Sequence, residues 1–385
     1  MRLAIGLLDF SQSRGGAERY LVDLSHRLAL EGHEVHVFAR RWEEDSSTLQ
    51  YHRIKTIPFP KSVCLLSFAR QATRKMKAGR FDLTFGVGNT LEVDVLQPHG
   101  GVHWAWFWRS LRAYDRPWLR AFRFLGRVLS MKQWVSGWIE NSPYRREKLS
   151  RIIAISDMVK QDMISWYGIP SDRITVVYNG VDTNRFHPQN RKDRTAIRKR
   201  HGIGEEIVLL FVSNNFQMKG LGHLMRALSS LKRRGSPAFK LLVLGRDRQQ
   251  PYRRLARRLG LSGEAVFAGT TLEPEKYYGA ADLLVHPSFY DACSLTVLEA
   301  MASGLPVITT SSNGAAGIVQ QGREGFVISD ATDEGELEEK IAFFFHPHRR
   351  EQASLAARSL AEDYSAERNW RAMKAIFEET EGRAR

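Results

Sequence analysis

Cysteines are scarce in this sequence, and long apolar runs are missing. Only two cysteines, Cys64 and Cys293, occur among the 385 residues, and they lie far apart without metal-ligand spacing. A disulfide framework is therefore excluded, and a reducing cytosol is the compartment that fits best. The apolar run 3–8 is too short for a signal peptide, and no segment reaches the ~18 apolar residues of a membrane helix. The sequence thus predicts a soluble protein or one bound to a membrane surface.

Acidic residues are also few relative to basic ones. The chain has 42 Asp and Glu against 57 Lys and Arg, which gives a formal net charge of +15. This balance favours an anionic partner, whether nucleic acid, an acidic membrane surface or a phosphorylated substrate, without choosing among them. The length, with 43% hydrophobic residues, suits two globular domains with substantial cores.

Two motifs of ligand binding are absent. The dinucleotide fingerprint GxGxxG does not follow the first apolar strand, and no Asp-x-Asp triplet or His/Cys/carboxylate cluster has metal-ligand spacing. We therefore expect no metal site. Any phosphate group that this chain binds must be neutralised by Lys, Arg and helix dipoles.

Apolar strands alternate with amphipathic helices in both halves of the chain. The expected strands are 2–8, 33–39, 83–86, 93–97 and 152–156, then 207–213, 240–245, 266–268, 283–286 and 307–310. The expected helices are 17–30, 219–233, 251–259 and about 294–303, with a helical tail over 334–345 and 352–380. Such alternation predicts an α/β protein with two doubly wound parallel-sheet domains facing a cleft.

Domain limits follow from the same pattern. A short strand runs into the turn at Asn179–Gly180, and the basic, apolar-poor stretch 190–201 looks like an interdomain connection. We predict a first Rossmann-like domain over 1–180 and a second over 181–363. The helical end, 364–385, is expected to pack back on the first domain.

The stretch 281–310 carries the strongest candidate site. Asp291 and Glu299 lie eight positions apart around the start of the expected helix, which at a helical rise separates them by roughly 12 Å. That is about the distance from the sugar of a nucleotide-sugar to its ribose. The backbone N–H groups near Cys293, Ser294 and Leu295, at the helix N-terminus, suit the diphosphate between them. The alternative is an ordinary βαβ unit with a capping acid and a solvated Glu.

Three further positions follow expected strands. Gly15 and Gly16 follow the first strand and let the backbone approach a phosphate or hexose, although they also suit a plain tight turn. Lys219 follows a strand and opens a helix, where a cation can neutralise a bound diphosphate or simply be solvated. His99 lies at the carboxyl end of strand 93–97, where open α/β sheets bind ligands, although a lone His is often structural.

Residues 104–148 form a basic-aromatic segment. It holds six of the nine tryptophans, and ten Arg or Lys against three acids, a difference of +7. Its arginines recur every three or four residues, at Arg109, Arg112, Arg116, Arg120, Arg123 and Arg127. Trp118, Phe122, Leu125 and Leu129 share another helical face. The pattern is typical of a helix on an anionic bilayer or phosphorylated glycolipid; the alternative is a core helix pair with a solvated basic face.

Four segments together resemble the retaining GT-B glycosyltransferases of family four. They occur in the family's order and cover nearly the whole chain: RGGAERYLVDLSHRLALEGHEVHVF, VVYNGVDTNRFHP, NNFQMKGLGHLMRAL and HPSFYDACSLTVLEAMASGLPVITT. Within the family, NNFQMKGLGHLMRAL, LLVLGRDRQQPYRRLARRLG and AADLLVHPSFYDAC are most similar to the lipopolysaccharide core glucosyltransferase I group. The resemblance implies the GT-B fold.

The resemblance also implies residue roles. Glu299 would bind the ribose hydroxyls, Asp291 the hexose hydroxyls, and Lys219 the leaving diphosphate. The backbone around Cys293, Ser294 and Leu295 would hold the diphosphate or sugar. Gly16, beside Gly15, would lie against the phosphates. His99 would contact the hexose near the reacting carbon.

Three positions depart from the family's pattern. Met218 stands where the family usually has an Arg beside its Lys, so part of the phosphate clamp must come from elsewhere, and Arg14 or Arg246 are the two candidates. Asp291 stands where the family usually has Glu. Its side chain is one methylene shorter, which affects which hydroxyls of the sugar it can contact. The lipopolysaccharide enzymes carry an acid where this chain has His99, although the wider family commonly has His.

The expected activity is a retaining, metal-independent hexosyltransferase without a cofactor. Its donor would be a nucleotide-sugar, UDP-glucose first, and its acceptor a lipid-linked phosphorylated saccharide, first of all the lipopolysaccharide inner core. Arg109, Arg112, Arg116 and Arg120 would grip acceptor phosphates or the anionic inner face of the cytoplasmic membrane, giving a cytoplasmic, peripheral protein. The alternatives are another polysaccharide or glycolipid acceptor, a nucleotide-sugar epimerase or a phosphorylase. A nucleic-acid-binding protein is the rival from another class, but no motif of that class is visible.

Overall fold

The chain divides into two compact units. The structure, a computed structural model, describes residues 1–11, 15–43 and 46–384. Unit 1 comprises 1–111, 115–178 and 370–385, and unit 2 comprises 112–114 and 179–369. The main divisions thus fall at 178/179 and 369/370, whereas the predicted ones are 180/181 and 363/364.

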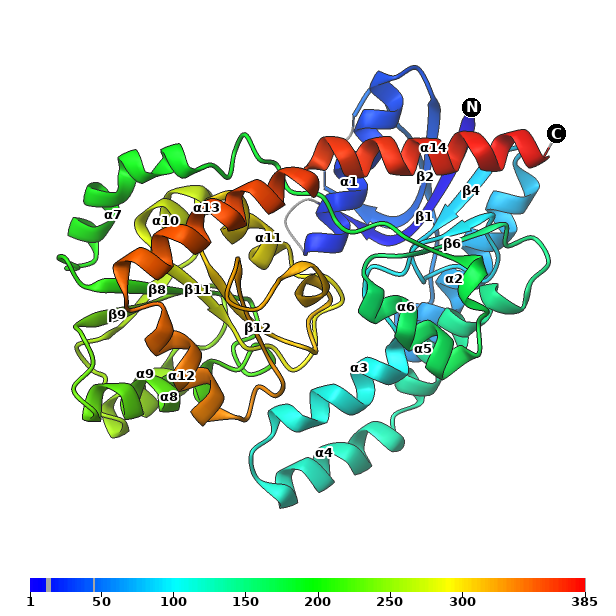
Figure 1. The fold of residues 1–385 in the computed structure, drawn as a ribbon. Helices are drawn as coiled ribbons and strands as arrows, with labels where there is room; N and C mark the ends of the chain where they lie inside the picture. Colours follow the sequence, from blue (N-terminus) through cyan, green and yellow to red (C-terminus); the bar gives the residue numbers. More distant parts are fainter. Residues whose placement is uncertain (12–14, 44–45, 385) are drawn as a thin grey trace. The chain divides into compact units, whose positions relative to one another are not determined.

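In the described part of unit 1, seven strands form one parallel sheet in the order β3-β2-β1-β4-β5-β6-β7 (Figure 1). The strands are β1 (Arg2–Phe10), β2 (Glu34–Trp42), β3 (Gln50–Arg53), β4 (Leu83–Gly86), β5 (Val95–Leu96), β6 (Arg151–Ala154) and β7 (Ile174–Val176). The order reverses between β1 and β4, which makes their carboxyl ends the expected ligand position of a doubly wound sheet.

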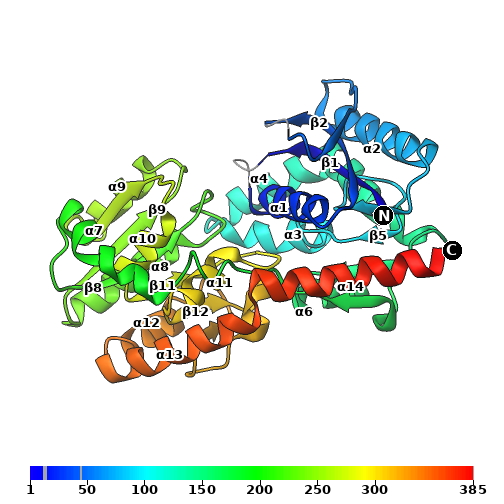
Figure 2. The same ribbon diagram turned by 90° about the horizontal axis from the view of Figure 1, so that it is seen from above.

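The helices of unit 1 include two segments from opposite ends of the chain. They are α1 (Gly16–Leu30), α2 (Lys61–Ala78), α3 (His103–Arg109), α4 (Pro117–Val128), α5 (Met131–Asn141), η2 (Pro143–Arg145), α6 (Asp157–Tyr167), η3 (Ser171–Arg173) and most of α14 (Ala366–Ala384). The short helix η1 (Ser110–Ala113) begins in unit 1 and ends in unit 2. Figure 2 shows α14 running along this unit. Met373 and Phe377 of α14 are fully buried in the same core as Leu3 and Phe85, so this helix packs against the sheet of unit 1.

In unit 2, six strands form a second parallel sheet in the order β10-β9-β8-β11-β12-β13. The strands are β8 (Ile207–Val212), β9 (Phe239–Leu244), β10 (Ala265–Gly269), β11 (Leu283–His286), β12 (Val307–Thr310) and β13 (Gly325–Ile328). The helices are η4 (Pro188–Asp193), α7 (Arg194–Arg200), α8 (Leu221–Arg233), α9 (Gln250–Arg258), α10 (Pro274–Ala280), α11 (Leu295–Ala302), η5 (Gly314–Ile318), α12 (Glu334–Phe343) and α13 (Pro347–Asp363). This order repeats that of the first six strands of unit 1, with its reversal between β8 and β11.

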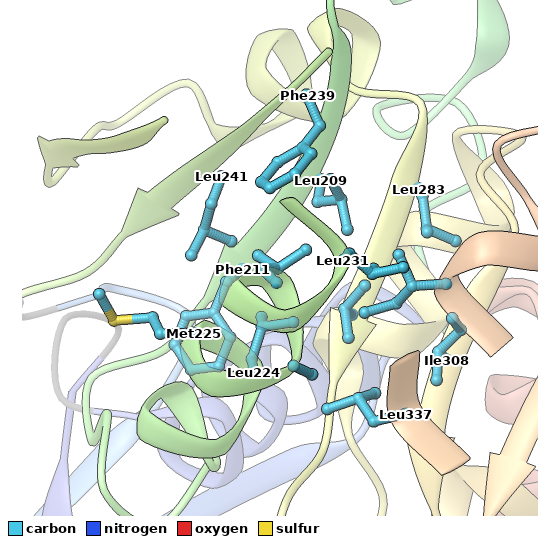
Figure 3. Packing of buried hydrophobic residues seen from close by; sticks show 14 of the residues in the cluster. Leu209, Phe211, Leu224, Met225, Leu231, Phe239, Leu241, Leu283, Ile308 and Leu337 are labelled. Atoms are coloured by element: carbon cyan, nitrogen blue, oxygen red, sulfur yellow. The ribbon is translucent and has the colours of Figure 1, made fainter. Parts of the chain in front are cut away.

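The core of unit 2 fixes α8 against the sheet. Figure 3 shows Leu224 of α8 and Leu337 of α12 packed with side chains from the strands, among them Phe211 and Leu283. All four side chains are fully buried. Burying one such side chain contributes about 2 kcal/mol, so this packing holds α8 and the loop before it in one position over the strand ends.

The predicted fold class of two doubly wound parallel sheets is confirmed, with local differences. Strands β3 and β13 and helices α2, α6 and α10 were not predicted. Strand β3 is a short sheet-edge strand with polar residues, QYHR, and gives little apolar signal. The helix expected from residue 219 begins at Leu221, which leaves Lys219 in the turn before it. No helix in the described part of the chain is long and apolar enough to cross a membrane.

Candidate functional site

The candidate site of unit 2 lies where the strand order reverses. Lys219 belongs to the loop after β8, and Asp291 to the loop after β11, and these two strands are neighbours in the sheet. In doubly wound sheets, ligands bind beyond the carboxyl ends of the two strands at this point. The topology therefore brings together two side chains that are 72 positions apart in the sequence.

Gly220 fixes the position of Lys219. Its φ is 74°, a left-handed conformation that favours glycine, and a Cβ added there would lie 2.2 Å from the carbonyl oxygen of Pro287. The backbone N–H of Phe289 also donates to the carbonyl of Met218 at 2.9 Å. The loop after β8 thus packs against the loop after β11 through the residues on both sides of Lys219, Met218 and Gly220.

Lys219 and Asp291 form an ion pair. The Lys219 Nζ lies 2.6 Å from Oδ2 of Asp291 and 3.0 Å from the carbonyl oxygen of Tyr290, and the two side chains are only 18% and 21% exposed. Burial alone would raise the pKa of Asp291, but the charge of Lys219 and the hydrogen bond from its ammonium hold that pKa below its usual value. Asp291 is therefore a carboxylate at neutral pH, ready to accept hydrogen bonds.

Some backbone groups at the start of α11 already have hydrogen-bond partners within unit 2. Ser294 is the residue that precedes the helix; its backbone N–H donates to Oδ1 of Asn313 at 3.2 Å, and its side chain hydrogen-bonds Asp291. The carbonyl of Cys293 accepts from Nδ2 of Asn179 at 3.1 Å. Of the three predicted positions, Ser294 already has a partner for its N–H, and the first helical residue, Leu295, lies at the positive end of the helix dipole.

Cys293 is buried, and its environment makes the thiol unreactive. Burial raises its pKa to about 12, so the side chain is a neutral thiol at any physiological pH. Its part in a site is therefore limited to its backbone and its volume.

Glu299 is held by Tyr278 of α10. The Tyr278 hydroxyl donates to Oε2 of Glu299 at 2.8 Å, and burial together with the Glu299 charge keeps the pKa of Tyr278 well above its usual value. The half-buried Glu299 thus has one oxygen engaged and a fixed orientation. An oriented carboxylate suits the recognition of paired hydroxyls.

The predicted separation of Asp291 and Glu299 rests on a helical rise over the whole stretch between them, and that stretch is only partly helical. The helix begins only at Leu295, and Asp291 lies before it in an isolated bridge with Asn313. The helical rise of 1.5 Å per residue therefore applies from Leu295 to Glu299 alone, and the estimate of roughly 12 Å between the two acids has no basis.

The residues predicted in unit 1 lie at the ends of its own strands and helices. Gly15 precedes α1 in extended conformation, and Gly16 is the first residue of the helix, after β1. His99 follows β5 and is 8% exposed, with Nε2 3.1 Å from Oε1 of Gln97 and its ring against Tyr20. Burial lowers the pKa of His99 to about 3, so its imidazole is neutral at pH 7. Arg14 lies outside the described residues.

The four predicted arginines of the basic-aromatic segment have different surroundings. Arg109 donates two hydrogen bonds, at 2.6 and 2.7 Å, to the buried carboxylate of Asp162, so it holds α3 on α6. Arg112 pairs with Asp330 within unit 2. The other two, Arg116 and Arg120, are exposed on or beside α4.

Met218 and Arg246 bear on the phosphate clamp. The side chain of Met218 packs on a small apolar cluster with Ala113, Phe289 and Ala331, so it contributes no charge to the site. Arg246 follows β9 and is exposed, with its backbone N–H bonded to Asn214. Among the described residues, no group of three or more His, Cys, Asp or Glu is arranged to hold a metal ion.

Sequence reasoning missed three residues that shape this site. Tyr278 orients Glu299, and Asn313 binds the backbone of Ser294 and Ala315 through one oxygen. Asn179, noted only as a turn signal, anchors the carbonyl of Cys293. Each acts across many positions of sequence, and only the turn-forming Asn-Gly pairs at 179 and 313 gave a local signal.

Two profiles of known families match this chain. "Glycosyltransferase Family 4" matches residues 14–185, and "Glycosyl transferases group 1" matches residues 193–359. Together they span both units. The chain is similar to the lipopolysaccharide glucosyltransferase WaaG of Escherichia coli K12, at 24% identity over 330 residues, which cover 85% of each protein.

Other comparisons extend the likeness. A GDP-mannose-dependent phosphatidylinositol monomannoside mannosyltransferase of Mycobacterium tuberculosis is 26% identical over 344 residues, 83% of each chain. A crystal structure of WaaG, a glycosyltransferase involved in lipopolysaccharide biosynthesis, covers 97% of this chain and 99% of its own at a TM-score of 0.79 and 22% identity. Anabaena Alr3699/HepE in complex with UDP-glucose covers 98% and 100% at a TM-score of 0.72 and 18% identity. The chain belongs to the GT-B glycosyltransferases of family four.

Proposed function

We propose that this glycosyltransferase transfers glucose from UDP-glucose to a hydroxyl of a lipid-linked, phosphorylated saccharide, the lipopolysaccharide inner core, with retention of anomeric configuration and without a metal ion. The observation that carries the proposal is the Lys219–Asp291 pair at the strand reversal of unit 2. Asp291 of this pair lies a few residues before the start of α11, the helix that carries Glu299. The likeness to WaaG, a lipopolysaccharide glucosyltransferase, supports the choice of donor and acceptor. HepE, whose structure contains UDP-glucose, supports a nucleotide-sugar donor.

In this proposal the donor binds at the end of the sheet in unit 2. Glu299, oriented by Tyr278, accepts hydrogen bonds from the ribose hydroxyls. The N-terminus of α11, at Leu295, faces the diphosphate with its dipole. Asp291, ionised at neutral pH, accepts hydrogen bonds from the hexose hydroxyls.

Lys219 supplies the largest catalytic effect. As the bond between hexose and diphosphate breaks, negative charge gathers on the leaving group and positive charge on the sugar, which becomes oxocarbenium-like. Lys219 neutralises the negative charge on the leaving group. The carboxylate of Asp291, which contacts Lys219, stabilises the positive charge on the sugar and keeps Lys219 in place. One such preorganised contact is worth about 3 kcal/mol of barrier. The leaving diphosphate then helps to deprotonate the acceptor hydroxyl.

The roles proposed for residues of unit 1 are those that the resemblance to family-four glycosyltransferases implies. His99 is neutral at pH 7, so it serves the hexose as a hydrogen-bonding group and not as a cation. Gly15 and Gly16 precede and begin α1, and the absence of their side chains lets a phosphate approach the backbone there.

The basic-aromatic segment is proposed to dock the protein on the inner face of the cytoplasmic membrane. Helix α4 has no buried residue, and it exposes aliphatic and aromatic side chains that continue onto α5. This α4–α5 apolar surface comprises Trp118, Phe122, Leu125, Leu129, Met131, Trp134 and Trp138, each at least 50% exposed. Exposed Arg116 and Arg120 add the charge that attracts anionic lipid headgroups.

A second acceptor class is favoured by one comparison. The mycobacterial relative acts on a phosphatidylinositol mannoside with GDP-mannose, and it also pairs a nucleotide-sugar with a lipid-linked acceptor. A glycolipid outside the lipopolysaccharide core therefore remains the alternative acceptor, and GDP-mannose the alternative donor.

A two-step experiment tests the proposal. Thermal shifts are first measured with UDP, UDP-glucose, GDP and GDP-mannose in buffer containing EDTA, and a shift with UDP and UDP-glucose alone is expected. Labelled glucose transfer to deglucosylated lipopolysaccharide is then followed by mass spectrometry, and the anomeric linkage by NMR. An inverted linkage, or turnover only after a divalent metal is added, contradicts the mechanism; an epimerised donor without transfer assigns the protein to the alternative chemistry.

A further inference from the structure

Unit 1 contains a pocket that the proposed reaction does not use. It has a volume of about 260 Å³ and lies between the end of α5 with η2 on one side and the end of α6 with η3 on the other. Its lining residues are Asn141, Tyr144, Arg145, Trp166, Tyr167, Gly168, Ile169, Pro170 and Arg173. We call it the α5–α6 pocket. Small-molecule pockets usually begin near 300 Å³, so this one suits a ligand smaller than a nucleotide.

The charge of the α5–α6 pocket is one-sided. Its lining includes the guanidinium groups of Arg145 and Arg173 and no carboxylate. A pocket in unit 2 gives the contrast, because its lining pairs Arg226 and Arg233 with Glu334 and Glu338. Guanidinium groups left without lining acids favour an anion, and their planar N–H groups match phosphate oxygens.

One buried polar group of this pocket has no partner. The hydroxyl of Tyr144 is buried and makes no hydrogen bond within the described residues, and burial together with the charge of Glu140, behind the pocket lining, keeps its pKa well above the usual value. The neighbouring ring of Tyr167, 5.3 Å away between centroids, is satisfied, because its hydroxyl donates to Oε1 of Glu140 at 2.8 Å. Buried hydroxyls in folded proteins nearly always have a partner, so the Tyr144 hydroxyl is a donor in need of an acceptor.

An aromatic ring completes the pocket. Trp166 lines it and is 43% exposed, so part of the indole is open to a ligand. The flat apolar face of a sugar ring packs on such a surface through dispersion and water release. The side-chain amide of Asn141, which also lines the pocket, can pair with sugar hydroxyls.

We propose that the α5–α6 pocket binds a phosphate ester of a sugar. The phosphate oxygens accept hydrogen bonds from Arg145, from Arg173 and from the orphan hydroxyl of Tyr144, and the sugar ring packs on Trp166. Arg173 donates one bond to the carbonyl of Leu149 at 3.3 Å, which orients its guanidinium and leaves other N–H groups for the ligand. The ligand is either a free sugar phosphate or a phosphorylated sugar of a lipid-linked saccharide. The pocket residues are separate from those proposed for the transfer reaction; a lipid-linked ligand rests on the proposed function, and a free sugar phosphate does not.

Calorimetric titration of the full-length protein with glucose 6-phosphate tests the site. Saturating UDP is present throughout, so that the proposed donor site is filled, and Lys219→Ala is titrated in parallel to exclude binding there. Binding is expected with glucose 6-phosphate, with at least tenfold weaker binding of glucose and of inorganic phosphate. Phosphorylated and dephosphorylated lipopolysaccharide oligosaccharides form the second arm, and tighter binding of the phosphorylated oligosaccharide than of glucose 6-phosphate identifies the lipid-linked source.

Three variants make the result specific. Arg145→Gln is expected to weaken binding about tenfold, which is the usual effect of losing one charge-assisted hydrogen bond. Arg146→Gln, at the exposed neighbouring position, is the control and is expected to leave binding unchanged. Tyr144→Phe removes the orphan hydroxyl at nearly constant volume, so the unliganded protein should keep or raise its Tm while binding weakens at least fivefold. The proposal is overturned if no binding of glucose 6-phosphate is detected up to about 10 mM, a concentration that reveals even weak millimolar affinities. It is also overturned if Tyr144→Phe lowers the Tm and leaves binding intact.

Discussion

The ammonium of Lys219 lies 2.6 Å from the carboxylate of Asp291, at the point where the strand order of the second sheet reverses. The cation proposed to stabilise the leaving diphosphate is thus paired with the acid proposed to read the hexose. Each side chain orients the other before any donor arrives, and their joint charge is zero. Binding of a diphosphate has to draw Lys219 partly away from this partner.

Replacement of Asp291 by Asn removes the charge but keeps the shape. The pKa of Asp291 is held below its unfolded value, so the carboxylate contributes stability above pH 4 that is lost as pH falls through its folded pKa. Asp291→Asn should lower the free energy of unfolding at pH 7 by about 1.5–3 kcal/mol, as for a lost charged hydrogen bond, and the difference from wild type should shrink toward pH 3. Urea unfolding of both proteins at pH 7 and pH 3.5 checks this. A difference that is constant with pH would mean that the ion pair does not form.

Gly220 sets the geometry of the Lys219 loop. In Gly220→Ala the new methyl group would lie 2.2 Å from the carbonyl oxygen of Pro287, at a φ of 74° that alanine disfavours. We expect a loss of at least about 1 kcal/mol of stability and no thermal shift with UDP. Gly222→Ala is the matched control, because its nearest neighbour would be a flexible Arg226 nitrogen at 3.7 Å, and a helical alanine stabilises by about 0.5–1 kcal/mol. Equal behaviour of the two variants would contradict the proposed packing.

Glu140 gives unit 1 an unusual dependence on pH. Its two oxygens accept from the backbone N–H of His103, and one also accepts from Tyr167, while burial raises its pKa to about 7. The folded protein binds this proton more tightly than the unfolded chain, so stability is greatest below pH 4.5 and falls as pH rises to 7. The shift corresponds to about 3 kcal/mol at most.

Glu140→Gln should remove that part of the dependence. The variant should be more stable relative to wild type at pH 8 than at pH 5, and Tm measurements at the two pH values check the sign. Glu147→Gln, on the exposed turn after η2, is the control and should change the Tm equally at both. If wild type and Glu140→Gln run parallel across this range, Glu140 titrates near its ordinary pKa.

The fold was largely predictable because apolar strands and amphipathic helices alternate with clear periods. Strands β4, β11 and β12 were predicted with their observed bounds. Strand β3 was not, since a polar edge strand has little apolar signal and forms only through pairing with β2. Within the site, the separate positions of Lys219 and Asp291 follow from strand ends and from the family's motifs. Their direct contact does not, since it needs the packing of Gly220 on Pro287.

The orientation of Glu299 was equally hidden. Its partner Tyr278 lies 21 positions earlier, on a helix whose placement depends on the whole second sheet. The engagement of the Ser294 N–H by Asn313, 19 positions later, is of the same kind. Contacts of this sort are set by tertiary packing, and single-sequence periodicity carries no information about them.

The α4–α5 apolar surface predicts membrane binding. Phe122→Ser combined with Leu125→Ser removes two side chains that are 68% and 55% exposed, so the fold should be unaffected. We expect co-sedimentation with anionic phosphatidylglycerol vesicles to fall at least fivefold, about 1 kcal/mol or more, and wild-type binding to weaken as salt is raised. Leu355→Ser, at a 72% exposed position of α13, is the control. Wild-type protein that fails to sediment at low salt would refute membrane docking.

The turnover of Lys219→Ala in metal-free buffer tests the central claim most directly. Initial rates of glucose transfer from UDP-glucose are measured in EDTA for wild type, Lys219→Ala and the exposed control Lys199→Ala. Lys219 is proposed to act mainly on the charge that develops as the diphosphate leaves, so kcat should fall about 100-fold, or ~3 kcal/mol, with a smaller change in the donor KM. Lys199→Ala should match wild type. A folded Lys219→Ala protein whose kcat stays within twofold of wild type would contradict the account.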